Sequence, residues 1–148
     1  MARRPGSFGL VLDLEDDTPP RRFDAPPGRH FYGHAAFSAD GGRLYTSEND
    51  YQSARGCIGV WEWRAGSAPR RIGEFDSHGV GPHEIGLLPG SNLLVVANGG
   101  IETHPDSGRA KLNLPLMAPS LTYIDRFSGA LLEQLSPPRQ LHKLSLRH

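Results

Sequence analysis

The sequence predicts an all-β fold built from antiparallel four-stranded blades of the β-propeller type. The 148 residues include 18 glycines and 13 prolines, a content typical of proteins with many tight turns. Short apolar stretches alternate with turn residues along the chain, which is the pattern of short strands. The sequence also repeats itself at a spacing of 49 residues, and a period of this size is typical of propeller blades.

The repeat is ungapped over much of the chain. It predicts that each copy folds as one supersecondary unit that packs against its neighbours. The identical pairs are Val11/Val60, Pro20/Pro69, Arg21/Arg70, Arg22/Arg71, His34/His83, Gly41/Gly90, Leu44/Leu93 and Asn49/Asn98.

Each copy divides into four short strands, as a blade requires. The expected strands of the first complete blade cover residues 34–40, 43–49, 57–63 and 69–75, and those of the second cover 83–89, 92–98, 120–126 and 130–136. A single domain is expected, with blade parts at 8–27, 34–76, 83–137 and 142–148. Since closing a propeller takes typically four to eight blades, we expect a propeller segment of about two complete blades plus partial blades at both ends.

The second copy contains an expanded loop. If His148 is the next equivalent of His83, the two are 65 residues apart, so this copy has 16 additional residues. They fall within 99–119, between the second and third strands, where the sequence is polar with one leucine-rich patch. Long loops of this kind are commonly functional, so we expect a working surface here rather than a linker.

Three repeat-related histidines are expected where successive blades converge around the central channel: His34, His83 and His148. Imidazole binds Zn, Cu, Fe and Ni well, so these residues are predicted to hold a divalent or transition metal ion. The alternative is structural, because each ring could instead bridge neighbouring blades through hydrogen bonds to the backbone.

Loops on the same face carry further imidazoles, carboxylates and amides. Such groups can hold a metal ion, serve as general acid and base, or bind a polar ligand. The alternative is turn chemistry, in which the asparagines cap strand ends and residues 104–109 form a type I turn. The predicted ligand-binding residues are His30, Glu48, Asn49, Asp50, Glu84, Asn98, Glu102, His104, Asp106 and Arg109.

Paired arginines recur on the expected outer strands, as Arg21/Arg22 and Arg70/Arg71. An outer strand is a sheet edge, and charged side chains at an edge discourage pairing with another sheet. We therefore expect these arginines to be solvent-exposed and to have no part in a site.

Composition argues against several classes of function. Sixteen basic residues balance sixteen acidic ones, so net charge does not favour nucleic acid or an anionic membrane as a partner. No run approaches the roughly 20 apolar residues of a membrane span, and no apolar stretch typical of an export signal follows the first arginines. Cys57 is the only cysteine and forms no internal disulfide. GxSxG, Walker, complete GxGxxG and HExxH motifs are absent from the sequence.

Several long motifs resemble one bacterial family, the domain-of-unknown-function family 1513. The motifs are RRPGSFGLVLDL, GRHFYGHAAFSADG, GVGPHE, VVANGGIETHPDSGRAKLNL and LHKLSLRH. The resemblance implies a propeller of roughly twice this length, exported folded through the twin-arginine pathway to the periplasm and often encoded beside iron-uptake components. A weaker similarity to YVTN and lactonase-type propellers rests on the tripeptide Gly81, Pro82 and His83.

These observations favour a non-enzymatic binding propeller whose channel face takes a metal ion or a metal-linked polar ligand. A second hypothesis is a metal-dependent, lactonase-like hydrolase in which Glu84 or Glu102 is the base. A third is a scaffold that docks a periplasmic protein and carries no chemistry.

Overall fold

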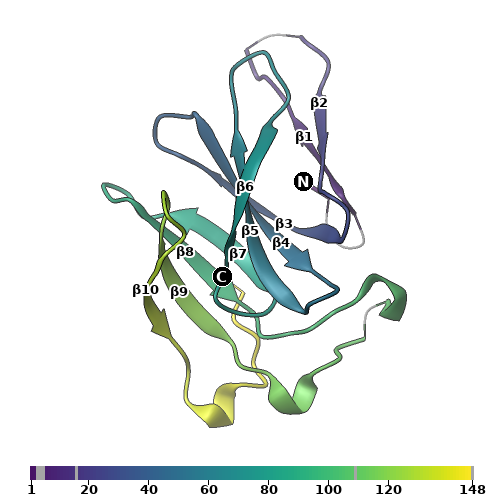
Figure 1. Ribbon diagram of the computed structural model, residues 1–148, viewed down its shortest axis with the longest axis vertical. Coiled ribbons are helices and arrows are strands. Elements are labelled where there is room, and N and C mark those ends of the chain that lie inside the picture. Colours follow the sequence, from purple (N-terminus) through teal and green to yellow (C-terminus); the bar gives the residue numbers. More distant parts are fainter. Residues whose placement is uncertain (3–5, 16, 109, 148) are drawn as a thin grey trace.

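The computed structural model describes residues 1–2, 6–15, 17–108 and 110–147, and within them ten strands form three antiparallel sheets (Figure 1). Sheet A consists of β1 (Phe8–Val11) and β2 (Arg21–Asp24). Sheet B consists of β3 (Arg29–Phe37), β4 (Arg43–Asp50), β5 (Arg55–Glu62) and β6 (Arg70–Asp76). Sheet C consists of β7 (Pro82–Leu87), β8 (Leu93–Asn98), β9 (Ser120–Asp125) and β10 (Leu131–Leu135). The described residues also form three short 3-10 helices: η1 (Pro105–Ser107), η2 (Leu114–Leu116) and η3 (Arg139–Leu141).

The predicted fold class is confirmed. Sheets B and C each contain four antiparallel strands that follow one another in chain order, which is the topology of a propeller-like blade. Sheet A contributes two further strands. The strand bounds agree with the expected ones to within a few residues, except that β3 begins at Arg29 instead of His34. The expanded loop lies between β8 and β9, as predicted.

The sheets pack face to face along the chain, and an apolar core fills each interface. The core between sheets A and B contains Phe23, Phe31, Leu44 and Trp61. The core between sheets B and C contains Tyr45, Ile58, Val60, Ile85, Leu94, Val96 and Ile124. Side chains on a strand point alternately to its two faces, so β4 supplies Leu44 to the first core and Tyr45 to the second.

In the second strands, residues that face the same way are 50 residues apart, one more than the 49-residue spacing of the sequence repeat. Leu44 faces the preceding sheet A, and Leu94, not Leu93, faces the preceding sheet B. A shift of one residue moves a side chain to the opposite face of a sheet. As a result Asn49 faces sheet C while Asn98 faces sheet B, and the structural counterpart of Asn98 is Glu48.

A β-bulge interrupts each innermost strand. The pairing of β3 with β4 shifts between Phe31 and Ala35, and that of β7 with β8 shifts between Pro82 and Glu84. Bulges bend a strand and re-aim its side chains. His34 and His83 both lie in these bulged segments.

Residues 142–147 contain turns and no strand. In the described part of the chain, no helix is long and apolar enough to cross a membrane.

Candidate functional site

His34 and His83 lie beside each other where β3 meets β7. Their ring centroids are 5.1 Å apart, with an interplanar angle of 41°. The Nδ1 atom of His34 is 2.8 Å from Oε2 of Glu84, while Oε1 of Glu84 accepts a hydrogen bond from the backbone N–H of Ile85. The side chains of His34 and Glu84 are 27% and 36% exposed. We call His34, His83 and Glu84 the inner-strand site.

The inner-strand site combines two imidazoles with a carboxylate that orients one of them. A carboxylate bound to one ring nitrogen fixes the tautomer and the ring orientation and raises the basicity of the other nitrogen, as in many metal-binding and basic histidines. Among the described residues, no three His, Cys, Asp or Glu side chains are arranged to hold a metal ion by themselves. His148, the third predicted metal ligand, lies outside the described residues.

His30 and Asn49 anchor the long loop to sheet B. Both side chains are buried. The Asn49 amide Nδ2 is 3.2 Å from Nε2 of His30 and donates to the backbone oxygen of Thr103 at 3.1 Å. The Thr103 hydroxyl is also 3.3 Å from the hydroxyl of Tyr32. These hydrogen bonds explain why His30 and Asn49 are polar although they are buried, and they give both residues the role of positioning the long loop.

Residues 104–108 form a turn of the kind considered in the sequence. The backbone N–H of Ser107 donates to the backbone oxygen of His104 at 3.1 Å, and Nδ1 of His104 accepts from the backbone N–H of Asp106 at 3.2 Å. The His104 ring also contacts the ring of Tyr51, at 5.3 Å between centroids, whereas the side chain of Asp106 is 91% exposed.

Glu102 lies at the base of the same loop, where its backbone N–H donates to Oδ1 of Asn113 at 2.8 Å. Arg109 lies outside the described residues. The structure thus places the predicted loop residues Glu102, His104 and Asp106 along one connection, with Asp106 pointing to solvent.

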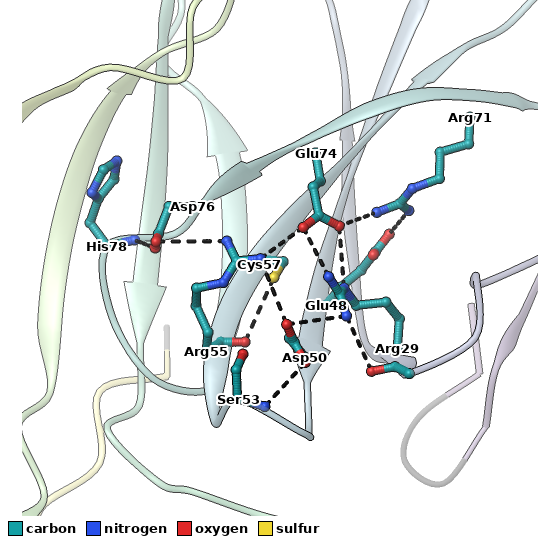
Figure 2. A network of polar contacts seen from close by, with 11 residues as sticks. Arg29, Glu48, Asp50, Ser53, Arg55, Cys57, Arg71, Glu74, Asp76 and His78 are labelled. Carbon is teal, nitrogen blue, oxygen red and sulfur yellow. Dashed lines mark hydrogen bonds and ion pairs between the residues drawn. The ribbon is translucent and has the colours of Figure 1, made fainter.

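Glu48 and Asp50 belong to a charged network on the face of sheet B that is turned toward sheet A (Figure 2). The carboxylate of Glu48 is fully buried, and its Oε1 accepts from the Thr46 hydroxyl at 2.6 Å and from Arg71 at 2.8 Å. Its Oε2 is buried and has no hydrogen-bond partner among the described residues. Arg71 is the only described cation that pairs with Glu48.

Glu74 connects the rest of this network. It pairs with Arg29 at 2.9 Å, Arg55 at 2.8 Å and Arg71 at 3.0 Å. The hydrogen bond from Arg29, with further contributions from Arg55 and from both positive charges, lowers the pKa of Glu74 to about 2, although partial burial opposes the shift. Asp50 lies at the edge of the network, 3.2 Å from Arg29.

Cys57 lies beneath the network and is an inert thiol. The residue is fully buried, and burial raises the pKa of its thiol to about 11. Because the thiolate is the reactive form, this cysteine is not a candidate nucleophile.

Asn98 is the centre of a smaller, uncharged cluster. Its Oδ1 accepts from the Ser77 hydroxyl at 2.8 Å, and its Nδ2 donates to the Ser77 backbone oxygen at 3.1 Å. The hydroxyls of Ser120 and Thr122 are also within 3.5 Å of Nδ2. The segment between β6 and β7 is thereby fastened to sheet C.

Four members of the charged network were not predicted: Arg29, Arg55, Arg71 and Glu74. The expectation of exposed outer-strand arginines holds for Arg70, whose side chain is 69% exposed. It is wrong for Arg71, which is 20% exposed and bound to Glu48, because a register shift in the β5–β6 pairing lies beside it, between Val60 and Trp61. A signal was available: Glu48 lies within an expected second strand, where side chains are buried, and a buried carboxylate needs a cation.

The consecutive four-stranded sheets and the polar groups on their inner strands define an all-β protein of the propeller-like class. The chain belongs to the family described as Protein of unknown function (DUF1513), which matches residues 1–148. This confirms the resemblance seen in the sequence. No curated protein matches the chain.

Proposed function

We propose that this protein is a binding protein whose inner-strand site takes a metal ion or a metal-linked polar ligand. The observation that carries the proposal is the meeting of two repeat-related histidines, each in a bulge of an innermost strand, at 5.1 Å between ring centroids. Bulges are over-represented next to functional sites because they re-aim side chains.

The chemistry of the three side chains supports this assignment. Glu84 would hold His34 by its Nδ1 atom, so that Nε2 of His34 and the ring of His83 become the two protein ligands. Paired imidazoles suit Zn, Cu, Fe and Ni. Two ligands do not complete a coordination sphere, so the bound molecule or water would supply the others. This open coordination favours a metal-linked ligand over a structural ion.

The test is a titration with cobalt(II), followed by absorption spectroscopy. Wild-type protein is expected to bind one ion per chain, and His34→Ala or His83→Ala should weaken binding by about tenfold or more. Glu84→Gln should weaken it by about tenfold through loss of ring orientation. His104→Ala is the matched control, because it removes an imidazole from the loop and should leave binding unchanged. If His83→Ala alters only the midpoint of urea unfolding, a docking scaffold is the better assignment.

A hydrolase is the second candidate, and the 2.8 Å contact between His34 and Glu84 favours it. An imidazole oriented by a carboxylate is a typical general base, and a bound divalent metal would activate water. Lactone turnover that requires added Ca, Mn or Zn and is lost in His34→Ala would support this candidate. Turnover equal in wild type and His34→Ala would exclude the pair as its catalytic base.

The family resemblance supports a periplasmic setting linked to iron uptake. We propose this setting for the protein as the cell makes it. Fractionation of a producing bacterium grown with and without iron tests it: enrichment in the periplasmic fraction, rising under iron limitation, is expected, and a purely cytoplasmic distribution contradicts it.

A further inference from the structure

A pocket of about 340 Å³ lies between the leucine-rich end of the long loop and the segment after β10. Leu114, Leu116 and Met117 line it from the loop, and Arg139, His142 and Lys143 line it from η3 and the turn that follows. In Figure 1 these two segments, green and yellow, run close to each other beyond the ends of β9 and β10. The pocket is made of other residues than the inner-strand site.

Hydrogen bonds hold both walls of the pocket in place. On the loop side, Asn113 accepts from the backbone N–H of Glu102 at 2.8 Å and donates to the backbone oxygen of Gly100 at 2.9 Å. On the other side, the Ser145 hydroxyl donates to the backbone oxygen of Gly99 at 3.0 Å. The two walls are thus tied to adjacent glycines that follow β8, the loop wall to Gly100 and the opposite wall to Gly99, which makes the pocket largely pre-formed.

The loop wall exposes apolar surface inside an otherwise polar connection. Leu114 is 44% exposed and Leu116 is 80% exposed, while Met117 beside them is buried. Exposed leucines that surround a concave site are typical of ligand-binding surfaces. This wall therefore suits an apolar group.

The opposite wall is cationic. Within the part of the chain that the structure describes, neither Arg139 nor Lys143 forms an ion pair, and no carboxylate lines the pocket. The arginines of sheet B, by contrast, are engaged with Glu48, Asp50 and Glu74. Two cations beside one pocket, with no internal counter-charge, favour an anion.

We infer that this pocket binds a small amphiphilic anion, a carboxylate or phosphate head group that carries a short alkyl chain. Arg139 and Lys143 hold the head group through charge-assisted hydrogen bonds, and the leucines cover the chain. The volume lies at the lower end of the range for ligand pockets, about 300–1,000 Å³, so one short chain fits and a large ligand does not. The pocket explains why the loop combines polar residues with a leucine-rich patch.

Calorimetric titration with decanoate below its micelle concentration tests the inference. Saturable binding at one decanoate per chain is expected, with decanol and acetate each binding at least about tenfold more weakly because each lacks one half of the recognition. The double variant Arg139→Gln/Lys143→Gln should lower decanoate affinity by about tenfold or more, and Leu116→Ser should lower it less. All of these side chains line an open pocket, so the variants are expected to keep the wild-type circular dichroism spectrum.

Two control variants separate the pocket from general surface adsorption. Lys111→Gln removes a positive charge from the same loop outside the pocket, and Leu132→Ser removes an exposed leucine from β10. Both should bind decanoate like wild type. Equal losses in the pocket and control variants, or decanoate binding no tighter than acetate, would overturn the inference.

Vesicles distinguish the source of the anion. Co-sedimentation with phosphatidylglycerol vesicles, in the absence of decanoate binding, would mean membrane adsorption and would also overturn the inference. Cobalt binding at the inner-strand site serves as an independent check, because it should be the same in Arg139→Gln/Lys143→Gln and in wild type.

Discussion

Sheets B and C carry different side chains at the same position of their second strands. Glu48 and Asn98 each face the preceding sheet, and each is fully buried. A glycine makes room for each of them. A Cβ atom at Gly59 would collide with the carboxylate of Glu48, and one at Gly79 would collide with the amide of Asn98.

The surroundings of the two side chains differ in kind. Asn98 is satisfied by neutral groups within a short reach, chiefly Ser77 and Thr122. Glu48 needs the positive charge of Arg71, and Arg71 also pairs with Glu74, which in turn binds two further arginines. The buried amide is thus satisfied by a few neighbouring neutral groups. The buried carboxylate instead belongs to a network of ion pairs with members on all four strands of its sheet.

The largest effect is expected from Arg71→Leu. Removing one partner of a buried ion pair leaves an uncompensated charge and costs about 3–5 kcal/mol of the free energy of unfolding. Urea denaturation measures this loss. Arg70→Leu is the matched control on the exposed side of β6 and should cost less than about 1 kcal/mol.

The double variant Glu48→Leu/Arg71→Leu sharpens this test. Replacing a whole buried ion pair by apolar residues is often neutral or stabilising, so most of the lost stability should return. A double variant as unstable as Arg71→Leu would show that Glu48 does not cause the effect, and that the other contacts of Arg71, with Glu74 at 3.0 Å and with the Trp61 ring at 5.1 Å, matter more.

A smaller effect is expected from Asn98→Ala. This change removes the amide that accepts from the Ser77 hydroxyl and donates to the Ser77 backbone oxygen, while Gly79 and Thr122 keep one hydrogen bond to each of these groups. Loss of buried hydrogen bonds of this kind costs about 1–3 kcal/mol. Urea denaturation again provides the measurement. Asn92→Ala, in the exposed turn just before the same strand, removes only a solvent-exposed hydrogen bond from Arg126 and should change stability by less than about 0.5 kcal/mol. Equal losses of unfolding free energy in the two variants would contradict a central stabilising role for Asn98 in sheet C.

The comparison also shows why the fold could be predicted and the register could not. Apolar stretches bounded by turn residues mark the strands in the sequence, and the eight strands of sheets B and C lie close to the expected bounds. The identities at a spacing of 49 aligned Asn49 with Asn98, yet the packing of the strands makes Glu48 the structural counterpart of Asn98. Side chains alternate with a period of two, so an error of one residue in the alignment exchanges the faces.

The candidate site could be predicted only in part, for a related reason. The meeting of His34 and His83 follows from blade convergence, which the repeat alone indicates, while their role as ligands stays a prediction. The network of Glu48 depends on pairing across β4, β5 and β6, and the bulge beside Arg71 decides which arginine turns inward. No local sequence pattern indicates such a bulge, so the sequence does not distinguish Arg71 from Arg70.

The smallest expected effect is a difference in pH dependence between the two clusters. The pKa of Glu74 is about 2 in the folded protein against an ordinary value of 4.5. A lowered pKa means that the carboxylate stabilises the fold above about pH 4.5 and that this contribution is lost as the pH falls toward 2. Urea unfolding between about pH 6 and pH 3 should therefore show falling stability in wild type and a flatter profile in Glu74→Gln. Asn98→Ala should keep the slope of wild type, because no group in its cluster titrates; a slope flattened equally by Asn98→Ala would mean that the two clusters are coupled through the core between sheets B and C.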